Sequence, residues 1–142
     1  MRLAINVALL SALALSACAP RTPAAAVGAV AVTPEIITAQ ATETRQVQIQ
    51  VFAAARPKGV LVFGHGASGS PDRYLPLFAR LNAAGYAVMA PVHVDSPQNP
   101  EHARYNLQTA FGERIADVGA AARAAAERFP GLPLAAVGVL SN

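Results

Sequence analysis

Only one cysteine, Cys18, is present among the 142 residues of the sequence. A single thiol cannot form an intramolecular disulfide, which excludes a disulfide-bonded framework. Charge of one sign is not concentrated either, because the 11 basic residues barely outnumber the 8 acidic ones and are scattered from Arg21 to Arg128. Binding to nucleic acid needs a localised basic patch, so we expect no nucleic-acid partner. The length suits one domain, and no internal repeat divides it.

The sequence also lacks a hydrophobic run long enough to span a bilayer comfortably. Its N-terminal apolar stretch, residues 3–15, is interrupted by Asn6 and Ser11 and follows the short basic start Met1–Arg2. Such a start and stretch are typical of a secretory signal peptide and not of a transmembrane helix.

The tetrad Leu-Ser-Ala-Cys, residues 15–18, follows directly. It resembles the bacterial lipobox, in which signal cleavage leaves the cysteine as the first residue and its thiol and amine carry lipid. We therefore expect residues 1–17 to be a lipoprotein signal peptide and Cys18 to be the lipidation site, which also explains the single cysteine of an exported chain. The alternative is a plain signal peptide that is cut near Ala19 and leaves a spare thiol.

Residues 18–34 contain mainly Ala, Val, Thr, Pro and Gly and show no periodicity. This composition is typical of a flexible tether. The resemblance to a lipoprotein implies a location in the bacterial cell envelope, with the membrane as a partner through the lipid anchor. Because Ala19, and not an aspartate, follows the cysteine, the periplasmic face of the outer membrane is favoured over the inner membrane.

Four consecutive apolar residues, Val60–Phe63, lie within the most informative stretch, Gly-Val-Leu-Val-Phe-Gly-His-Gly-Ala-Ser-Gly. They are too few for a helix and show no alternation, so they predict a strand buried on both faces of a mostly parallel sheet. Residues 64–69, which we call the glycine loop, place His65 between two glycines and predict unusual dihedral angles or a close approach of the backbone. Open α/β sheets bind ligands at the carboxyl ends of their strands, which favours a site here over an ordinary glycine-rich turn.

Periodicity predicts the other elements of the domain, residues 35–142. Val47, Ile49 and Val51 alternate with glutamines, which indicates a strand at a sheet edge or in an antiparallel pair. A helix is expected after Ser70, with Gly85 as its left-handed C-terminal cap. The expected strands are residues 35–38, 45–52, 60–63, 86–90 and 134–137.

The clearest helix in the sequence precedes the last of these strands. Apolar residues recur in it at intervals of three and four, and charged residues occupy mainly the other side. We expect the helix to cover the sheet with its apolar side. That side comprises Leu107, Phe111, Ile115, Val118, Ala122, Ala125 and Phe129, and the charged side comprises Glu113, Asp117, Arg123, Glu127 and Arg128.

The polar loop 91–104 contains two histidines and a carboxylate, His93, Asp95 and His102. Such residue types can ligate a metal ion. The two histidines are not at helical ligand spacing and no second pair supports them, so we expect no metal site. We interpret the three as solvated loop residues or as part of the rim of a substrate cleft.

A buried strand that ends in His-Gly, a loop of small residues, a helix that ends in Ala-Ala-Gly-Tyr and a strand that ends in Ala-Pro together resemble the first half of an α/β-hydrolase. Within that superfamily the stretch from residue 45 to residue 138 is most similar to the dienelactone-hydrolase-like and polyester-hydrolase-like branch. The resemblance implies an α/β fold with a mostly parallel sheet, an antiparallel start and helices on both faces. It also implies carboxylic-ester hydrolase chemistry without a cofactor.

The resemblance further implies roles for the glycine loop. In these enzymes the residue after the His-Gly pair supplies a backbone N–H to the oxyanion hole. In this sequence that donor is Ala67, with Ser68 as the alternative. Gly64, His65 and Gly66 support the loop, and His65 orients it without acting as the catalytic base.

In this family the nucleophile elbow, Gly-x-Ser-x-Gly, follows the last of these strands. Here the strand reaches Gly138 and continues Val-Leu-Ser-Asn, so Leu140 occupies the nucleophile position and Ser141 falls one residue late. The acid and the base follow the nucleophile in the chain order of this fold, whereas all three histidines precede it. We therefore assign no catalytic residue in this chain.

Two hypotheses follow for the function. In the first, the chain is the N-terminal half of an exported ester hydrolase, truncated at the nucleophile elbow, and it acts on a small-molecule ester only when the missing half completes it. In the second, it is a non-enzymatic half-domain, or a frameshifted or truncated product, anchored at the membrane.

Overall fold

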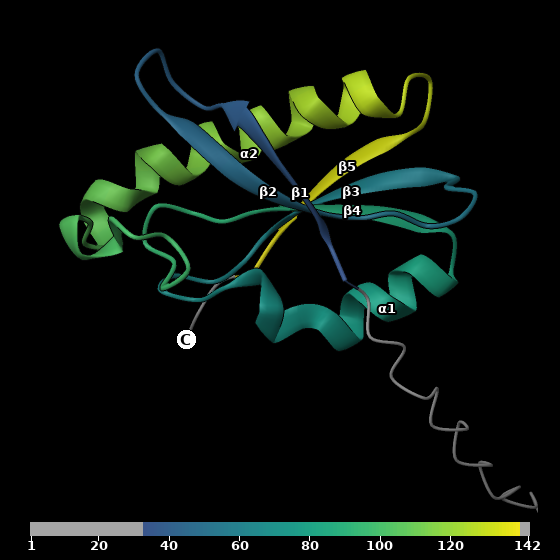
Figure 1. Ribbon diagram of the computed structural model, residues 1–142, viewed down its shortest axis with the longest axis horizontal. Coiled ribbons are helices and arrows are strands. Elements are labelled where there is room, and N and C mark those ends of the chain that lie inside the picture. The colour runs from purple at the N-terminus through teal and green to yellow at the C-terminus, as the bar shows by residue number, and fades with distance from the viewer. Residues whose placement is uncertain (1–32, 140–142) are drawn as a thin grey trace, which may run out of the picture.

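The structure is a computed structural model that describes residues 33–139, which form a five-stranded sheet with helices on both faces (Figure 1). The strands are β1 (Glu35–Gln40), β2 (Gln46–Phe52), β3 (Gly59–Gly64), β4 (Tyr86–Pro91) and β5 (Leu134–Gly138). The helices are η1 (Pro71–Tyr74), α1 (Leu75–Ala83), η2 (His102–Arg104) and α2 (Leu107–Arg128). The predicted signal peptide, Cys18, Leu140 and Ser141 lie outside the described residues.

The order of the strands in the sheet is β1-β2-β4-β3-β5. β2 is antiparallel to both β1 and β4, whereas β3 is parallel to both β4 and β5. The mostly parallel sheet with an antiparallel start is thus confirmed. Because β2 has a partner on each side, it is not an edge strand, and Gln50 on its expected wet face is buried.

Two separate cores lie on the two faces of the sheet. On one face, Val60 and Val62 of β3 pack against alanines of α2. On the other face, Phe63 packs against Phe78 of α1, with ring centroids 5.0 Å apart. Successive side chains of a strand point to opposite faces, so the apolar run of β3 supplies both cores.

The N-terminal half of α2 is rotated relative to the sequence expectation. Leu107, Phe111 and Ile115 are 70, 66 and 60% exposed, whereas Asp117, expected on the solvent side, is fully buried. The residues of α2 that are buried are Ala110, Asp117, Ala120, Ala121 and Ala125. The expected apolar side is therefore wrong for this half, because small alanines and the partners of Asp117 face the sheet there.

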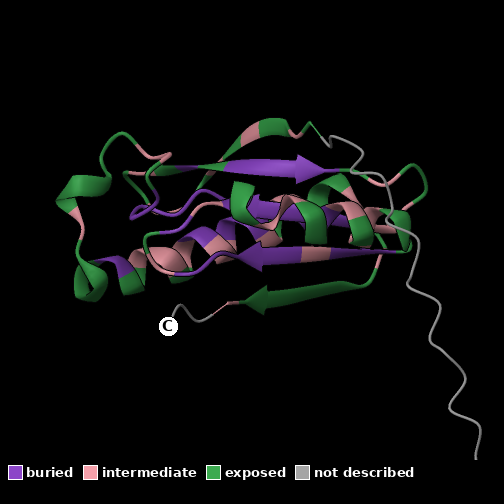
Figure 2. Ribbon diagram, turned by 90° about the horizontal axis from the view of Figure 1, so that it is seen from below, coloured by how far each residue is buried: buried purple, intermediate pink, exposed green. Residues whose placement is uncertain are grey.

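β5 forms one edge of the described sheet and is exposed along its whole length (Figure 2). Its apolar side chains Leu134 and Val137 are 43 and 45% exposed, although their neighbours on β3 are largely buried. Within residues 33–139 this edge has no further strand beside it. No described helix combines the length and the apolar character that crossing a bilayer requires.

Candidate functional site

The carboxyl ends of the parallel strands β3, β4 and β5 lie together at one end of the sheet, along the strand direction. We call this end the site edge. Gly64 of β3 lies opposite Gly138 of β5, and the N–H of Val139 donates to the Gly64 carbonyl over 3.0 Å. The chain that leaves β5 therefore starts beside the glycine loop. This is the position at which the sequence predicts a nucleophile elbow.

His65 is fully buried at the start of the glycine loop and uses both ring nitrogens. Its Nδ1 lies 2.8 Å from the carbonyl oxygen of Gly66, and its Nε2 accepts the backbone N–H of His93 over 3.2 Å. These partners assign the proton to Nδ1. Burial lowers the pKa of His65 to about 4, although the bond to Gly66 opposes this shift. The ring is thus neutral near pH 7 and connects the glycine loop to the end of β4.

The turn of the glycine loop depends on Ser68 and Gly69. The N–H of Gly69 donates to the Gly66 carbonyl over 3.0 Å, and Ser68 has a φ of 51°. A Cβ on Gly69 would lie 2.9 Å from the Gly66 oxygen. The unusual dihedral expected at a glycine is therefore found at a serine, and the close approach is found at Gly69.

An ion pair between Asp95 and Arg114 bonds the backbone of the glycine loop at two residues. Arg114 Nη1 lies 2.7 Å from Asp95 Oδ1, and its Nη2 donates to the His65 carbonyl. Asp95 Oδ2 accepts the backbone N–H of Ser68 over 2.9 Å. Burial by itself raises the pKa of Asp95, but the Ser68 N–H and the Arg114 guanidinium outweigh it and lower that pKa below its ordinary value. Asp95 is therefore ionised at neutral pH.

A second polar group lies beneath the loop. His93 Nδ1 lies 3.1 Å from Asp117 Oδ2, and Arg45 Nη1 lies 2.7 Å from Asp117 Oδ1. Arg45 also pairs with Glu113, with Nη2 and Oε2 2.7 Å apart. Burial lowers the pKa of His93 despite its bond to Asp117. The buried carboxylate is thus compensated by Arg45, while His93 remains neutral.

Of the three residues His93, Asp95 and His102 in the 91–104 loop, the interpretation as solvated is wrong for two. His93 and Asp95 are 1 and 6% exposed, and only His102 lies in solvent. Their hydrogen bonds to α2 and to the glycine loop explain this burial, since polar groups enter a protein interior when partners are present. Across residues 33–139, no three His, Cys, Asp or Glu side chains come together as a metal site.

The two candidate oxyanion donors differ in their contacts. The N–H of Ser68 is already bonded to Asp95, whereas the N–H of Ala67 has no acceptor among the described residues. Ala67 is half-buried and Ser68 is exposed. A bound oxyanion would therefore meet an unoccupied donor at Ala67, and at Ser68 it would have to displace a carboxylate.

An open groove of about 480 Å³ lies elsewhere, between β1 and α2. Its lining includes Thr38, Gln40, Arg123 and Arg128, and no residue of the glycine loop contributes to it. We place the candidate site at the site edge because the unpaired donor and the converging strand ends are there.

Sequence reasoning missed the residues that hold the loop. The sequence places Asp117 on the solvent side of its helix and gives Arg45 and Arg114 no role, although all three contact this group of buried residues. One signal was present, because Asp117 interrupts a row of alanines on α2 at the spacing of the buried face.

No protein-family model matches the chain, and no curated protein matches it by sequence. Solved structures of an esterase and two lipases resemble its fold. A thermostable carboxyl esterase from Bacillus coagulans has a TM-score of 0.56 at 19% identity, with 72% of this chain and 34% of the esterase covered. A lipase in its open form has a TM-score of 0.57 at 21% identity, with coverage of 74 and 35%. A monoglyceride lipase from Saccharomyces cerevisiae has a TM-score of 0.54 at 16% identity, with coverage of 74 and 34%.

The likeness concerns the fold, because these identities are low. The chain spans about a third of the length of each of these three structures.

Proposed function

From the fold, which is that of the N-terminal part of an α/β-hydrolase, we propose that the chain forms the oxyanion-hole side of a carboxylic-ester hydrolase. The observation that carries the proposal is the N–H of Ala67, which has no acceptor among the described residues and lies in the loop beside the end of β5. In such a reaction the donor binds the negatively charged oxygen of the tetrahedral intermediate.

The contacts around the loop support this role. An oxyanion donor is effective when it is fixed before the reaction, since no reorganisation is then needed. His65 and the Asp95–Arg114 ion pair fix the backbone on both sides of Ala67. Neutral His65, with both ring nitrogens engaged, serves in positioning and not in proton transfer.

Catalysis requires groups that this chain does not carry in the positions of the family motif. Leu140 stands where the nucleophilic serine is expected, and no acid and base follow it in residues 1–142. We propose that a further part of the fold supplies them and pairs with β5. The exposed apolar residues of β5 and of the first half of α2 support this, because a neighbouring strand and helix would cover them.

We further propose that the protein is an envelope lipoprotein. This proposal is supported by the sequence of residues 1–18, which has a basic start, an apolar stretch and the lipobox-like tetrad that ends at Cys18. The ester substrate would then be hydrolysed on the periplasmic side, with the outer membrane favoured by Ala19.

The alternative proposal is a membrane-anchored half-domain, or a truncated or frameshifted product, without activity. Leu140 at the nucleophile position favours it. Translation of the DNA that follows codon 138 in all frames separates the two, because an intact His-Ser-x-Gly continuation supports the hydrolase. Unrelated sequence there supports the alternative.

The decisive experiment uses hydrolysis of p-nitrophenyl butyrate. The 142-residue chain should give the background rate, and turnover that Ser141→Ala abolishes would contradict this. In the protein joined to the recovered continuation, Ala67→Pro should lower kcat by about 100- to 1000-fold, because it removes one oxyanion donor. Ala67→Gly keeps the N–H and is the matched control. Equal rates for the two variants would remove Ala67 from the oxyanion hole.

A further inference from the structure

β1 begins at the end of the sheet opposite the site edge. Glu35 lies opposite Val51 near the end of β2, and β1 runs in the same direction as β3 and β4. The loop from β2 to β3 lies at this end, which we call the sheet base. Any segment that precedes β1 therefore joins the domain at the sheet base, whereas the glycine loop lies at the far end.

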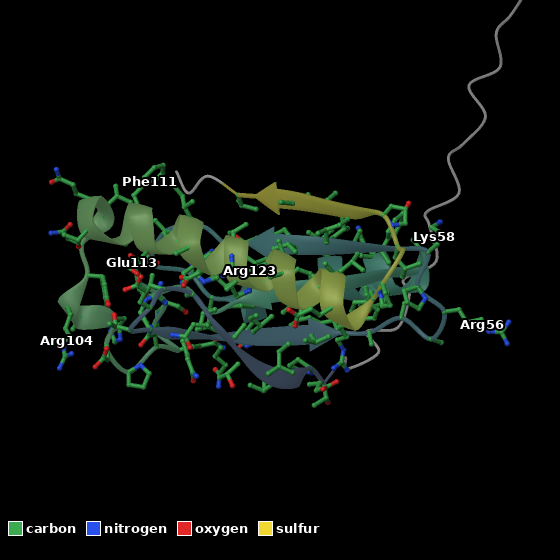
Figure 3. The ribbon with its side chains drawn as sticks, turned by 90° about the horizontal axis from the view of Figure 1, so that it is seen from above. Arg56, Lys58, Arg104, Phe111, Glu113 and Arg123 are labelled. Atoms are coloured by element: carbon green, nitrogen blue, oxygen red, sulfur yellow. The ribbon has the colours of Figure 1, made fainter. Side chains whose placement is uncertain are left out.

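The charges of the described domain are divided along the same axis. The sheet base carries four basic and two acidic residues, Arg56, Lys58, Arg80, Arg128, Glu35 and Glu127. The site edge carries four basic and six acidic residues, Arg45, Arg73, Arg104, Arg114, Glu43, Asp72, Asp95, Glu101, Glu113 and Asp117. Arg123 lies between the two ends (Figure 3). The sheet base is thus net positive and the site edge is net negative.

Three of the four basic side chains at the sheet base, Arg56, Lys58 and Arg80, are available to an external anion, whereas Arg128 is paired with Glu35. Arg56 and Lys58 are exposed and lie together at the end opposite Arg104 and Glu113 (Figure 3). Arg56, Lys58 and Arg80 form no ion pair among residues 33–139. The ammonium of Lys58 lies 4.8 Å from the centre of the Tyr86 ring, which holds the side chain at this surface.

We infer that the sheet base is a docking surface for anionic phospholipid headgroups, so that the anchored domain stands with its glycine loop facing away from the bilayer. The inference rests on the proposed lipid anchor at Cys18. The anchor brings the sheet base near the membrane, and the negative surface potential of anionic lipid attracts basic residues within about 10 Å of it. The net negative site edge is repelled by the same surface, so both ends favour one orientation.

The test places a fluorophore at one end of the domain or the other. Ala55→Cys and Ala103→Cys label exposed positions next to Arg56 and Arg104. Each lipidated protein is reconstituted into vesicles that contain a headgroup-attached quencher. We expect stronger quenching at position 55 than at 103 in phosphatidylethanolamine–phosphatidylglycerol vesicles. The ratio of the quenching at position 55 to that at position 103, which we call the quenching ratio, should fall in phosphatidylcholine vesicles and at high salt.

Charge variants decide whether the basic residues cause this orientation. Arg56→Ala with Lys58→Ala should lower the quenching ratio toward one, since each basic residue near an anionic surface contributes to attraction. Arg73→Ala with Arg104→Ala removes two exposed charges at the site edge and is the matched control, which should not lower the ratio. A ratio that is independent of lipid charge, salt and the first pair of substitutions would overturn the inference.

A different attachment to the vesicle distinguishes an error in the proposed docking surface from an error in the proposed lipid anchor. Residues 1–18 are replaced by a hexahistidine tag, which holds the chain at the same point on nickel-chelating lipid. If Cys18 carries no lipid but the tagged chain shows the charge-dependent ratio, the docking surface stands and the anchor is wrong. Circular dichroism of the bound variants shows that each keeps its fold.

Discussion

The carboxylate of Asp95 accepts the backbone N–H of Ser68 over 2.9 Å and thereby occupies one of the two candidate oxyanion donors. The same carboxylate is paired with Arg114, whose second nitrogen bonds the carbonyl of His65. Residues from the β4–α2 connection and from α2 thus determine the shape of a loop that follows β3.

This relationship predicts that Asp95 controls the order of the glycine loop. Asp95→Ala should increase hydrogen exchange at the Ser68 amide, because its acceptor is removed. The variant should lose about 1–3 kcal/mol of unfolding free energy, since Arg114 also loses its partner. Exposed Asp72 provides the control: Asp72→Ala should leave exchange at Ser68 as in the parent. Unchanged exchange in Asp95→Ala would show that the loop is held by other contacts.

Two glycine substitutions should change stability in opposite directions. Gly69→Ala should cost about 1–3 kcal/mol, because its Cβ would lie 2.9 Å from the Gly66 carbonyl oxygen. Gly112→Ala should add up to about 1 kcal/mol, because that position lies in α2 and its Cβ would meet no atom within 4 Å. Urea unfolding of the two variants measures both. A Gly69→Ala midpoint at or above that of the parent would mean that the turn relaxes without cost.

Acid should destabilise the domain through its buried histidines. The folded-state pKa of His65 is about 4, below the ordinary value of 6.5, so the unfolded chain binds a proton more readily between these values. Stability is therefore complete above about pH 6.5 and falls as the pH is lowered toward about 4. The lowered pKa of His93 acts in the same direction.

Thermal unfolding across this pH range measures the effect. The parent should lose stability with a slope of up to about one proton for His65, and His65→Asn should reduce that slope. His102→Asn also removes a histidine, but from the exposed η2 helix, and serves as the matched control. A parent whose unfolding temperature does not change from pH 7 to pH 4.5 would contradict the neutral, buried state of His65.

Cys18 should carry the lipid of the mature chain. Metabolic labelling with palmitate should mark the parent, and the labelled protein should sediment with the membrane fraction. Cys18→Ser should remove both the label and the sedimentation, whereas Ser16→Ala keeps the cysteine and should preserve them. Retention of label in Cys18→Ser would show that the tetrad is not a lipobox.

The sequence predicted the elements of the domain because their signals are local. A run of four apolar residues at Val60–Phe63 forms β3, and alternation at Val47, Ile49 and Val51 places β2 in antiparallel pairs. Apolar repeats indicated the helix α2, which spans Leu107–Arg128, although they misplaced the buried side of its first half. The resemblance of the His-Gly loop to those of α/β-hydrolases indicated the fold. Each of these features depends on neighbouring residues, which a single sequence displays directly.

The tertiary structure alone decided which polar residues are buried. Arg45 and Glu113 are 68 positions apart in the sequence, yet they meet beside Asp117, whose burial turns one side of α2 toward the sheet and leaves Phe111 in solvent. Likewise, Asp95 is buried because Arg114 and the Ser68 N–H compensate its charge. A carboxylate is stable in a protein interior only when distant partners converge on it, and that convergence exists only in the folded chain.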